Sequence, residues 1–190
     1  MPDDKVLVKE ILGGSEAAME VLTRKYYNVV FAYVYRKLLD RETACDLTQE
    51  IFIKIIKNIH AYTGQMAFST WVYTISLNHC RDYWRSNEYK NKAKQDELTD
   101  SISVNYSSVT YIFEAKQSRE LVKRTIESLP EYQREVILLK YFHELKIKEI
   151  AVITDSSEST VKSRLKQGLA KVAIWLEKEE SEYESKRKEP

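Results

Sequence analysis

The sequence predicts an all-α protein of two small helical domains joined by a flexible linker, with a helix-turn-helix in the C-terminal domain. Its 190 residues include only 4 Gly and 3 Pro, so residues that form turns are scarce. Apolar residues recur at the helical spacing through most of the chain. One polar stretch without this spacing divides the chain into two halves, which predicts two domains.

The first half contains helical patterns at residues 6–12, 16–39, 43–59 and 69–86. The third pattern has one apolar stripe, formed by Leu47, Ile51, Ile55 and Ile59. Two carboxylates, an amide and an apolar side chain point away from this stripe: Asp46, Gln49, Glu50 and Ile53. Such a face suits a helical protein interface with a charged rim, although a solvated acidic face is the simpler alternative.

The fourth pattern, "FSTWVYTISLNHCRDYWRS", has two apolar stripes. The first contains Phe68, Val72, Ile75 and His79, with Trp71 alongside, and the second contains Tyr73, Leu77, Cys80 and Trp84. A polar seam lies between them: Thr74, Asn78, Arg81 and Arg85. A surface helix usually needs one apolar face, so the second stripe indicates either burial on two sides or aromatic side chains that bind a ligand.

The polar stretch "EYKNKAKQDELTDSISVNYSSVTY" lacks aliphatic periodicity and is predicted to be a linker. The expected organisation is a first domain at residues 1–88, a linker at 89–115, a second domain at 116–176 and a charged tail at 177–190. The tail has few apolar residues and is expected to fray.

The second half contains "IKEIAVITDSSESTVKSRLKQGLAKV", which predicts two helices around a polar turn. The first helix, residues 146–153, directs Ile147, Ile150 and Ala151 inward, and the turn covers residues 154–157. Ser157 or Ser159 can cap the second helix. Its apolar stripe is Val161, Leu165, Leu169 and Val172, and its other side carries Ser159, Lys162, Ser163, Lys166 and Gln167. This is the layout of a helix-turn-helix that reads DNA, and an amphipathic hairpin with a solvated basic face is the alternative.

Composition argues against several other classes of function. The three His residues are scattered and no Gly-rich phosphate loop occurs, so no metal site, cofactor or catalytic set is predicted. The net charge of +1 means that any surface for nucleic acid must come from local clustering. Cys45 and Cys80 are expected to be buried or half-buried thiols. Without a long apolar run or a signal peptide, the expected location is the cytoplasm, with no membrane insertion.

The C-terminal pattern "SLPEYQREVILLKYFHELKIKEIA…ESTVKSRLKQGLAKV" resembles that of the bacterial extracytoplasmic-function (ECF, group IV) sigma factors of the sigma-70 family. In that family this domain reads the −35 promoter element as duplex DNA. The resemblance implies a DNA-facing set: Ser159, Thr160, Lys162, Ser163, Lys166 and Gln167. Arg164, closer to the supporting helix at residues 146–153, is expected to contact a phosphate. The chain departs from the family at Thr154, Asp155 and Ser156, where Leu-Gly and an aliphatic residue are usual, and at Gln167, where Arg is frequent.

The stretch "TACDLTQEIFIKIIKNIHAYTGQMAFSTWVYTISLNHCRDYWRS" resembles the other half of the same family. It implies that a segment containing Asp46, Gln49, Glu50 and Ile53 binds the clamp helices of core RNA polymerase. It also implies a surface that opens the −10 element and holds one strand: Tyr62, Gly64, Gln65, Met66, Phe68, Trp71, Thr74, Asn78, Arg81 and Arg85. At least two of the aromatic residues Tyr62, Phe68, Trp71, Tyr73 and Trp84 are expected to be purely structural.

The resemblance further implies contact with the polymerase flap and control by an anti-sigma protein, often membrane-anchored, that binds between the two domains. In the linker, Asp96, Glu97 and Asp100 would form an acidic, RNA-mimicking stretch. Two other hypotheses compete with this one. A dimeric helix-turn-helix repressor would bind duplex DNA without polymerase, and an enzyme would show turnover of its own.

Overall fold

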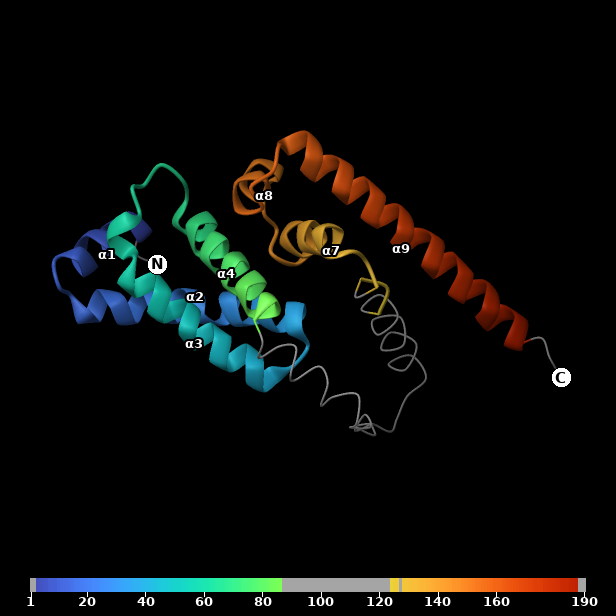
Figure 1. Cartoon of the computed structure of the whole chain (residues 1–190), viewed down its shortest axis with the longest axis horizontal. Helices are drawn as coiled ribbons and strands as arrows, with labels where there is room; N and C mark the ends of the chain where they lie inside the picture. The colour runs from blue at the N-terminus through green and yellow to red at the C-terminus, as the bar shows by residue number, and fades with distance from the viewer. Residues whose placement is uncertain (1–2, 87–123, 127, 188–190) are drawn as a thin grey trace. The chain divides into compact units, whose positions relative to one another are not determined.

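The computed structural model describes residues 3–86, 124–126 and 128–187, and describes side chains as far as residue 178. In chain order its elements are α1 (Asp4–Leu12), α2 (Glu16–Leu38), α3 (Arg41–Lys57), η1 (Ile59–Ala61), α4 (Phe68–Arg85), α7 (Glu131–Ile137), η2 (Leu138–Phe142), α8 (Ile147–Ile153) and α9 (Glu158–Arg187) (Figure 1). These described residues contain no strand, and the predicted all-α class is confirmed. The four helices predicted in the first half match α1 to α4 within a few residues.

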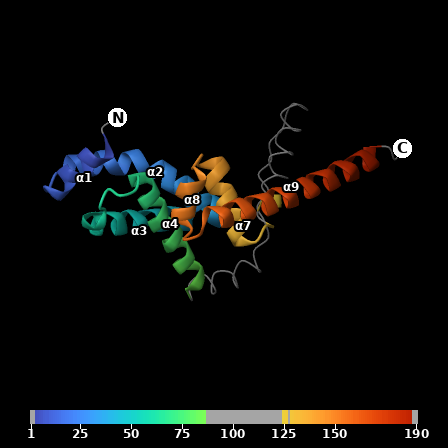
Figure 2. The same ribbon diagram turned by 90° about the horizontal axis from the view of Figure 1, so that it is seen from above.

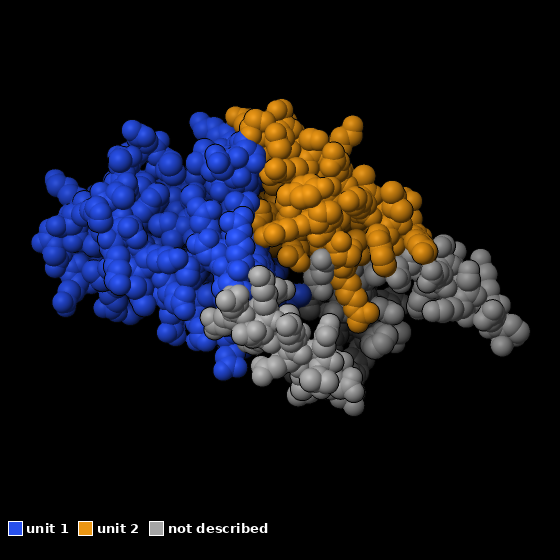
Figure 3. Space-filling model, in the orientation of Figure 1, with its two compact units in different colours: residues 1–100, 148–156 blue, residues 101–147, 157–190 orange. Residues whose placement is uncertain are grey.

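Contacts divide the chain into two compact units, residues 1–100 with 148–156 and residues 101–147 with 157–190 (Figure 3). This grouping joins the segment 148–156, which includes most of α8, to the first unit, whereas the sequence assigned it to the second domain. The expected domain boundaries therefore stay a prediction. The expected linker at 89–115, including Asp96, Glu97 and Asp100, lies outside the described residues.

Side chains next to the helices of the first unit define where those helices begin. The carboxylates of Asp3 and Asp40 and the hydroxyl of Ser15 accept hydrogen bonds from backbone N–H groups at the starts of α1, α3 and α2, at 3.1–3.2 Å. These bonds satisfy donors that have no partner within the helix. Leu39 adopts a left-handed conformation (φ 63°) and ends α2.

Helix α4 is buried on two sides because it packs against both α2 and α3. Val72 and Phe68 of its first apolar stripe are 1% and 2% exposed, and Leu77 and Cys80 of its second stripe are fully buried. Figures 1 and 2 both show α4 lying along α3. Burying each large aliphatic side chain contributes about 1.5–3 kcal/mol, so both stripes stabilise the unit. Two-sided burial accounts for the second stripe.

In the second unit, α7 and α9 pack closely against each other at a glycine. A Cβ atom on Gly168 would lie 2.7 Å from Cδ1 of Ile137, which is too close for a real contact. Val161 and Leu165 of the predicted stripe are buried, but Leu169 is 39% exposed, and that part of the prediction is wrong. Gly168 is buried in its place, because the close approach of α7 selects a small residue there and not an apolar one.

Helix α9 is longer than the sequence predicted, since it continues through the charged segment to Arg187. In Figures 1 and 2 it extends well beyond α7. The expectation that residues 177–190 fray is therefore wrong as far as Arg187. The segment is rich in Glu and Lys, which have high helix propensity.

The turn between α8 and α9 depends on one strained residue. Asp155 has a φ of 50°, the left-handed conformation that the family's usual Gly adopts without cost. The N–H of Ser156 bonds to the carbonyl of Ala151 at 2.9 Å and closes the end of α8. The hydroxyl of Ser157 then accepts a bond from the N–H of Thr160 at 3.1 Å, so Ser157 is the residue that caps α9.

We expect Asp155→Gly to raise the free energy of unfolding by about 0.5–1 kcal/mol, because glycine removes the strain of a left-handed residue. Asp155→Ala is the matched control and should lower it by a similar amount, since it keeps the Cβ atom and loses the polar group that tolerates this conformation. Urea denaturation followed by circular dichroism measures both. A loss of stability in the glycine variant would show that the Asp155 carboxylate makes a stabilising contact that outweighs the strain.

Candidate nucleic-acid and polymerase interfaces

Helix α3 separates a buried stripe from an exposed face, as the sequence predicted. Leu47, Ile51, Ile55 and the following Ile59 are 0–6% exposed. The four residues opposite are all exposed, and Ile53 is 52% exposed: Asp46, Gln49, Glu50 and Ile53. Such a face suits a protein interface with a polar rim, and it also suits a solvated acidic surface. The structure therefore brings the predicted quartet together on one surface.

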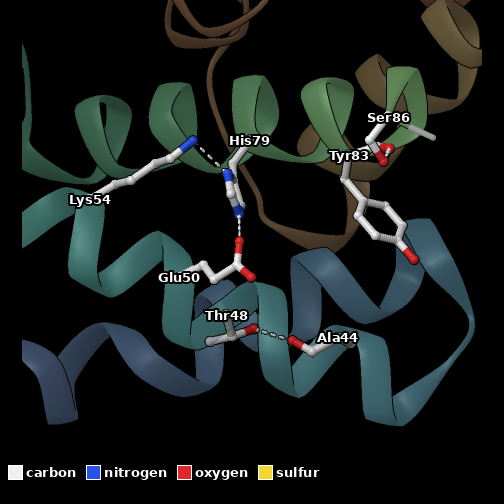
Figure 4. Close-up of polar contacts among 7 residues, drawn as sticks. All are labelled: Ala44, Thr48, Glu50, Lys54, His79, Tyr83 and Ser86. Atoms are coloured by element: carbon white, nitrogen blue, oxygen red, sulfur yellow. Dashed lines mark hydrogen bonds and ion pairs between the residues drawn. The ribbon is translucent and has the colours of Figure 1, made fainter. Parts of the chain in front are cut away.

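One member of this face is held by a buried histidine that sequence analysis assigned only to an apolar stripe. Nε2 of His79 in α4 lies 2.8 Å from a carboxylate oxygen of Glu50, and Nδ1 lies 2.7 Å from Nζ of Lys54 (Figure 4). Since an ammonium can only donate, Nδ1 accepts from Lys54 and Nε2–H donates to Glu50. Nothing in the spacing of residues 50, 54 and 79 indicates this network, because it joins two helices.

Burial and the Lys54 ammonium favour the neutral form of His79. Burial lowers the pKa of His79, the Lys54 ammonium lowers it further, and the hydrogen bond and charge of Glu50 oppose them, with Asp82 adding a weaker effect. Protonating Nδ1 would direct a new N–H at the Lys54 ammonium, so the neutral tautomer suits both partners. His79 therefore binds the Glu50 carboxylate without carrying a charge.

The predicted −10 surface is built on an aromatic cluster at the start of α4. The ring centroids of Tyr62, Phe68 and Trp71 lie 5.1–5.6 Å apart. Phe68 is only 2% exposed and supports the other two rings, which are half-buried. The hydroxyl of Tyr62 donates to the carbonyl of Met66 at 2.8 Å and so closes the loop of residues 62–66. Within this loop Gly64 has a φ of 77°.

The other predicted −10 residues differ in how accessible they are. Gln65, Asn78 and Arg85 are exposed, and Met66 is 38% exposed. Arg81 and Thr74 are half-buried, and the Thr74 hydroxyl donates to the Thr70 carbonyl at 2.9 Å. Within the seam, Asn78 and Arg85 are therefore the accessible side chains.

Two further aromatic residues of α4 contact α2. Tyr73 is 4% exposed and packs edge-on against Tyr33, with ring centroids 5.6 Å apart. Trp84 lies 4.6 Å from Nζ of Lys37, which is 3% exposed. A buried cation over an aromatic face contributes about 2 kcal/mol, so this pair ties the end of α4 to α2. Tyr73 is buried and Trp84 is half-buried, and the expectation that some of these rings only support the fold stays a prediction.

Helix α9 presents most of the predicted −35 residues to solvent. Ser159, Lys162, Ser163, Lys166 and Gln167 are exposed. Thr160 is half-buried, and its hydroxyl lies 2.8 Å from that of Ser157. The half-buried guanidinium of Arg164 lies 5.6 Å from the ring centroid of Tyr132 in α7. The sequence placed Arg164 near the helix of residues 146–153, and that expectation stays a prediction.

The structure also bears on metals and membranes. The part of the chain that it describes contains no cluster of three or more His, Cys, Asp or Glu residues suited to hold a metal ion. None of the helices in the described segments has the length and hydropathy to cross a membrane. Cys80 is buried and Cys45 is half-buried, as predicted.

Comparison with known proteins identifies the family. Residues 22–89 match the family model for sigma-70 region 2, and residues 119–172 match that for sigma-70 region 4. The chain is also 30% identical over 169 residues to the ECF RNA polymerase sigma-E factor of Escherichia coli K12, an alignment that covers 85% of this chain and 88% of the relative. The chain belongs to the ECF sigma factors. It is thus a transcription initiation factor that directs bacterial RNA polymerase to promoters, and the predicted family is confirmed.

Other relatives agree with this assignment. The sigma factor is 29% identical over 171 residues to the ECF RNA polymerase sigma-E factor of Haemophilus influenzae, with 85% of this chain and 89% of the relative aligned. Two solved structures share its fold. CnrH, in complex with the cytosolic domain of CnrY, has a TM-score of 0.67 at 20% identity, over 92% of this chain and 97% of CnrH. RpoE of Bartonella quintana, in complex with the anti-sigma factor NepR, has a TM-score of 0.64 at 18% identity, over 83% and 96%.

We expect the neutral state of His79 to make stability depend on pH. The folded pKa lies below the ordinary value of 6.5, so as pH falls through that value the unfolded chain takes up a proton that the folded sigma factor does not. The wild type should therefore lose more stability between pH 7.5 and 5.5 than a His79→Gln variant, as measured by urea denaturation at both values.

The exposed His60 provides the control for the substitution itself, because His60→Gln makes the same replacement outside the Glu50–His79–Lys54 network. An equal loss of stability in the wild type and in His79→Gln would mean that His79 titrates alike in the folded and unfolded states.

Proposed function

We propose that this sigma factor binds core RNA polymerase through the exposed face of α3 and promoter DNA through α4 with its preceding loop and through α9. The observation that carries the proposal is that the predicted residues on α3 and α9 lie mainly on exposed faces opposite buried stripes. The matches to sigma-70 regions 2 and 4, in this order, support the same division of tasks.

The proposed polymerase-binding face of α3 combines one apolar side chain with polar and charged groups around it. Ile53 offers an apolar contact that is desolvated on binding, and Asp46, Gln49 and Glu50 surround it with acceptors. Glu50 meets the partner already oriented, because His79 holds its carboxylate. A pre-oriented side chain loses less conformational entropy on binding, which supports its use as an anchor for the clamp helices.

The −10 surface combines a stacking platform with donors for the DNA backbone. Tyr62 and Trp71 present half-buried rings that rest on Phe68, and such rings bind the faces of unstacked bases. Gln65 and Met66 in the adjoining loop are exposed and form the rim of a base pocket, with Gly64 providing its turn. Asn78, Arg81 and Arg85, with Thr74 between them, would follow the strand along α4. Because this surface would bind single-stranded DNA, its binding energy would favour melting of the −10 element.

The −35 surface lies on the first three turns of α9. Lys162 and Lys166 supply positive charge for phosphates or guanine edges, and Ser159, Thr160 and Ser163 allow close approach of the helix. Arg164, turned toward Tyr132, would reach a phosphate at the edge of the groove. The short side chains at the start of the helix suit insertion of its N-terminal end into the major groove.

The sigma factor would act in the cytoplasm without turnover of its own, since polymerase carries out the chemistry and no resident cofactor is required. Control by an anti-sigma factor is also proposed, because RpoE of B. quintana was solved with the anti-sigma factor NepR and CnrH with the cytosolic domain of CnrY. An autonomous repressor would bind duplex DNA tightly without polymerase. Transcription in vitro from promoter templates, with cognate core polymerase and with either protein alone, distinguishes the two functions.

Core binding can be tested with Gln49→Ala and Ile53→Ala. Each variant should weaken the affinity for core polymerase by about tenfold, because loss of an interface anchor costs about 1–2 kcal/mol. Both residues are exposed, so the melting temperature should stay unchanged. Asn28→Ala in α2 is the control, since Asn28 is exposed and belongs to none of the proposed surfaces. Wild-type affinity in both α3 variants, measured by fluorescence anisotropy, would remove α3 from the interface.

Promoter recognition by α9 can be tested with Lys162→Ala. We expect transcription from a promoter that depends on its −35 element to fall by about tenfold, and the salt dependence of DNA binding to weaken by about one ion if Lys162 contacts a phosphate. Lys171→Ala removes the same charge from an exposed position further along the same helix and should have little effect. Equal losses in the two variants would indicate a general effect of charge and not a specific contact.

A further inference from the structure

Gln167 stands where the family frequently carries Arg, and its amide is tied to a buried residue of α7. Nε2 of Gln133 donates to Oε1 of Gln167 at 3.1 Å, and Nε2 of Gln167 donates to the hydroxyl of Ser163 at 3.3 Å. Gln133 is 1% exposed, whereas Gln167 and Ser163 are exposed. A chain of hydrogen bonds thus runs from the interior of the second unit to the proposed DNA-facing surface.

The close packing of α7 on α9 makes this chain possible. At Gly168, next to Gln167, an added Cβ atom would lie 3.4 Å from Cβ of Gln133 and 2.7 Å from Cδ1 of Ile137. The absence of a side chain at Gly168 therefore lets the two helices approach until the amides meet. Among the residues that the structure describes, Oε1 of Gln133 has no hydrogen-bond partner, so its bond to Gln167 is the one that its amide makes there. Losing that bond would leave the whole amide unsatisfied, which favours keeping it.

The direction of the bond decides what Gln167 can present to DNA. Pairing with adenine requires the oxygen and the nitrogen of one amide to face the base together, the oxygen accepting from N6 and the nitrogen donating to N7. In this structure the oxygen of Gln167 is directed at the interior, toward Gln133. Its NH₂ group carries two N–H bonds, one directed at Ser163, so the other remains for a ligand.

We propose that Gln133 is a positioning residue for promoter specificity, which holds the amide oxygen of Gln167 toward the interior so that its NH₂ group faces DNA. The group that it contacts is then an acceptor, such as a phosphate oxygen or the O6/N7 edge of guanine, and the bidentate pair with adenine is not formed. This inference rests on the proposed binding of the −35 element by α9. Gln133 acts through Gln167 and does not itself touch DNA.

The test is transcription by the holoenzyme from templates randomised at each −35 position, with the −10 element held constant. Comparing the wild type with Gln167→Ala identifies what Gln167 contacts. Loss of a guanine preference at one position indicates the base. A contact with the backbone would leave the base profile unchanged in Gln167→Ala. A methylphosphonate at one −35 phosphate would then lower transcription by the wild type about fivefold and leave transcription by the variant unchanged.

Gln133→Leu is the decisive variant, because leucine keeps a similar volume beside Gly168 and removes the donor. Freed from the interior, the Gln167 amide should rotate, and we expect adenine to become favoured by about fivefold at the base pair nearest residue 167. The proposal would be overturned if the wild type preferred adenine at this position and Gln167→Ala removed that preference. It would also be overturned if Gln133→Leu kept both the base preferences and the methylphosphonate sensitivity of the wild type.

Two controls keep the outcomes separate. If Gln133→Leu does not fold, as judged by circular dichroism, Gln167→Glu replaces it. Glutamate keeps an acceptor for Gln133 but has no outward donor, so it should lose the same contact as Gln167→Ala, and wild-type behaviour would overturn the proposal. An effect of Lys162→Ala without any effect of Gln167→Ala would overturn it while leaving the −35 function intact. If the wild type enriches no −35 sequence at all, the proposed function itself has failed.

Discussion

The burial of α4 on two sides organises the first unit. Because α4 packs against both α2 and α3, its position fixes three separate features along its length. Its first turn supports the Tyr62 and Trp71 rings through Phe68. Its middle carries His79 to the Glu50 carboxylate, and its end places Trp84 against Lys37. A shift of α4 would therefore disturb the proposed DNA surface and the proposed polymerase surface at the same time.

This arrangement explains why polar groups in the interior of the unit matter for its surface. His79 is buried, yet its partner Glu50 belongs to an exposed face. The neutral imidazole satisfies an ammonium and a carboxylate without adding a buried charge, which avoids the large desolvation cost of an ion in the interior. The hydrogen bond thus transmits the rigid packing of α4 to a side chain of α3 that is otherwise free to change rotamer.

The second unit uses a comparable arrangement with a different chemistry. Here the absence of a side chain at Gly168 allows α7 to approach α9, and a neutral amide pair, Gln133 with Gln167, joins the interior to the exposed face. In both units a buried polar residue on one helix orients an exposed polar residue on its neighbour. Burying such a contact costs little free energy when the buried residue is neutral and hydrogen-bonded. The contact also limits the conformations that a surface residue samples before it binds its partner.

The sequence by itself determined the all-α class, the bounds of α1 to α4 to within a few residues, the capped turn before α9 and the exposed quartet on α3. These features follow from local rules, since helical periodicity, capping residues and opposite faces depend on neighbours a few positions away. Family resemblance supplied the functional assignment of those faces. Only the tertiary structure decided which aromatic rings are buried, that Gly168 replaces Leu169 in the core, and that His79 and Gln133 hold Glu50 and Gln167. Those contacts join residues 29 and 34 positions apart, and their existence depends on how closely two helices pack, which no local pattern encodes.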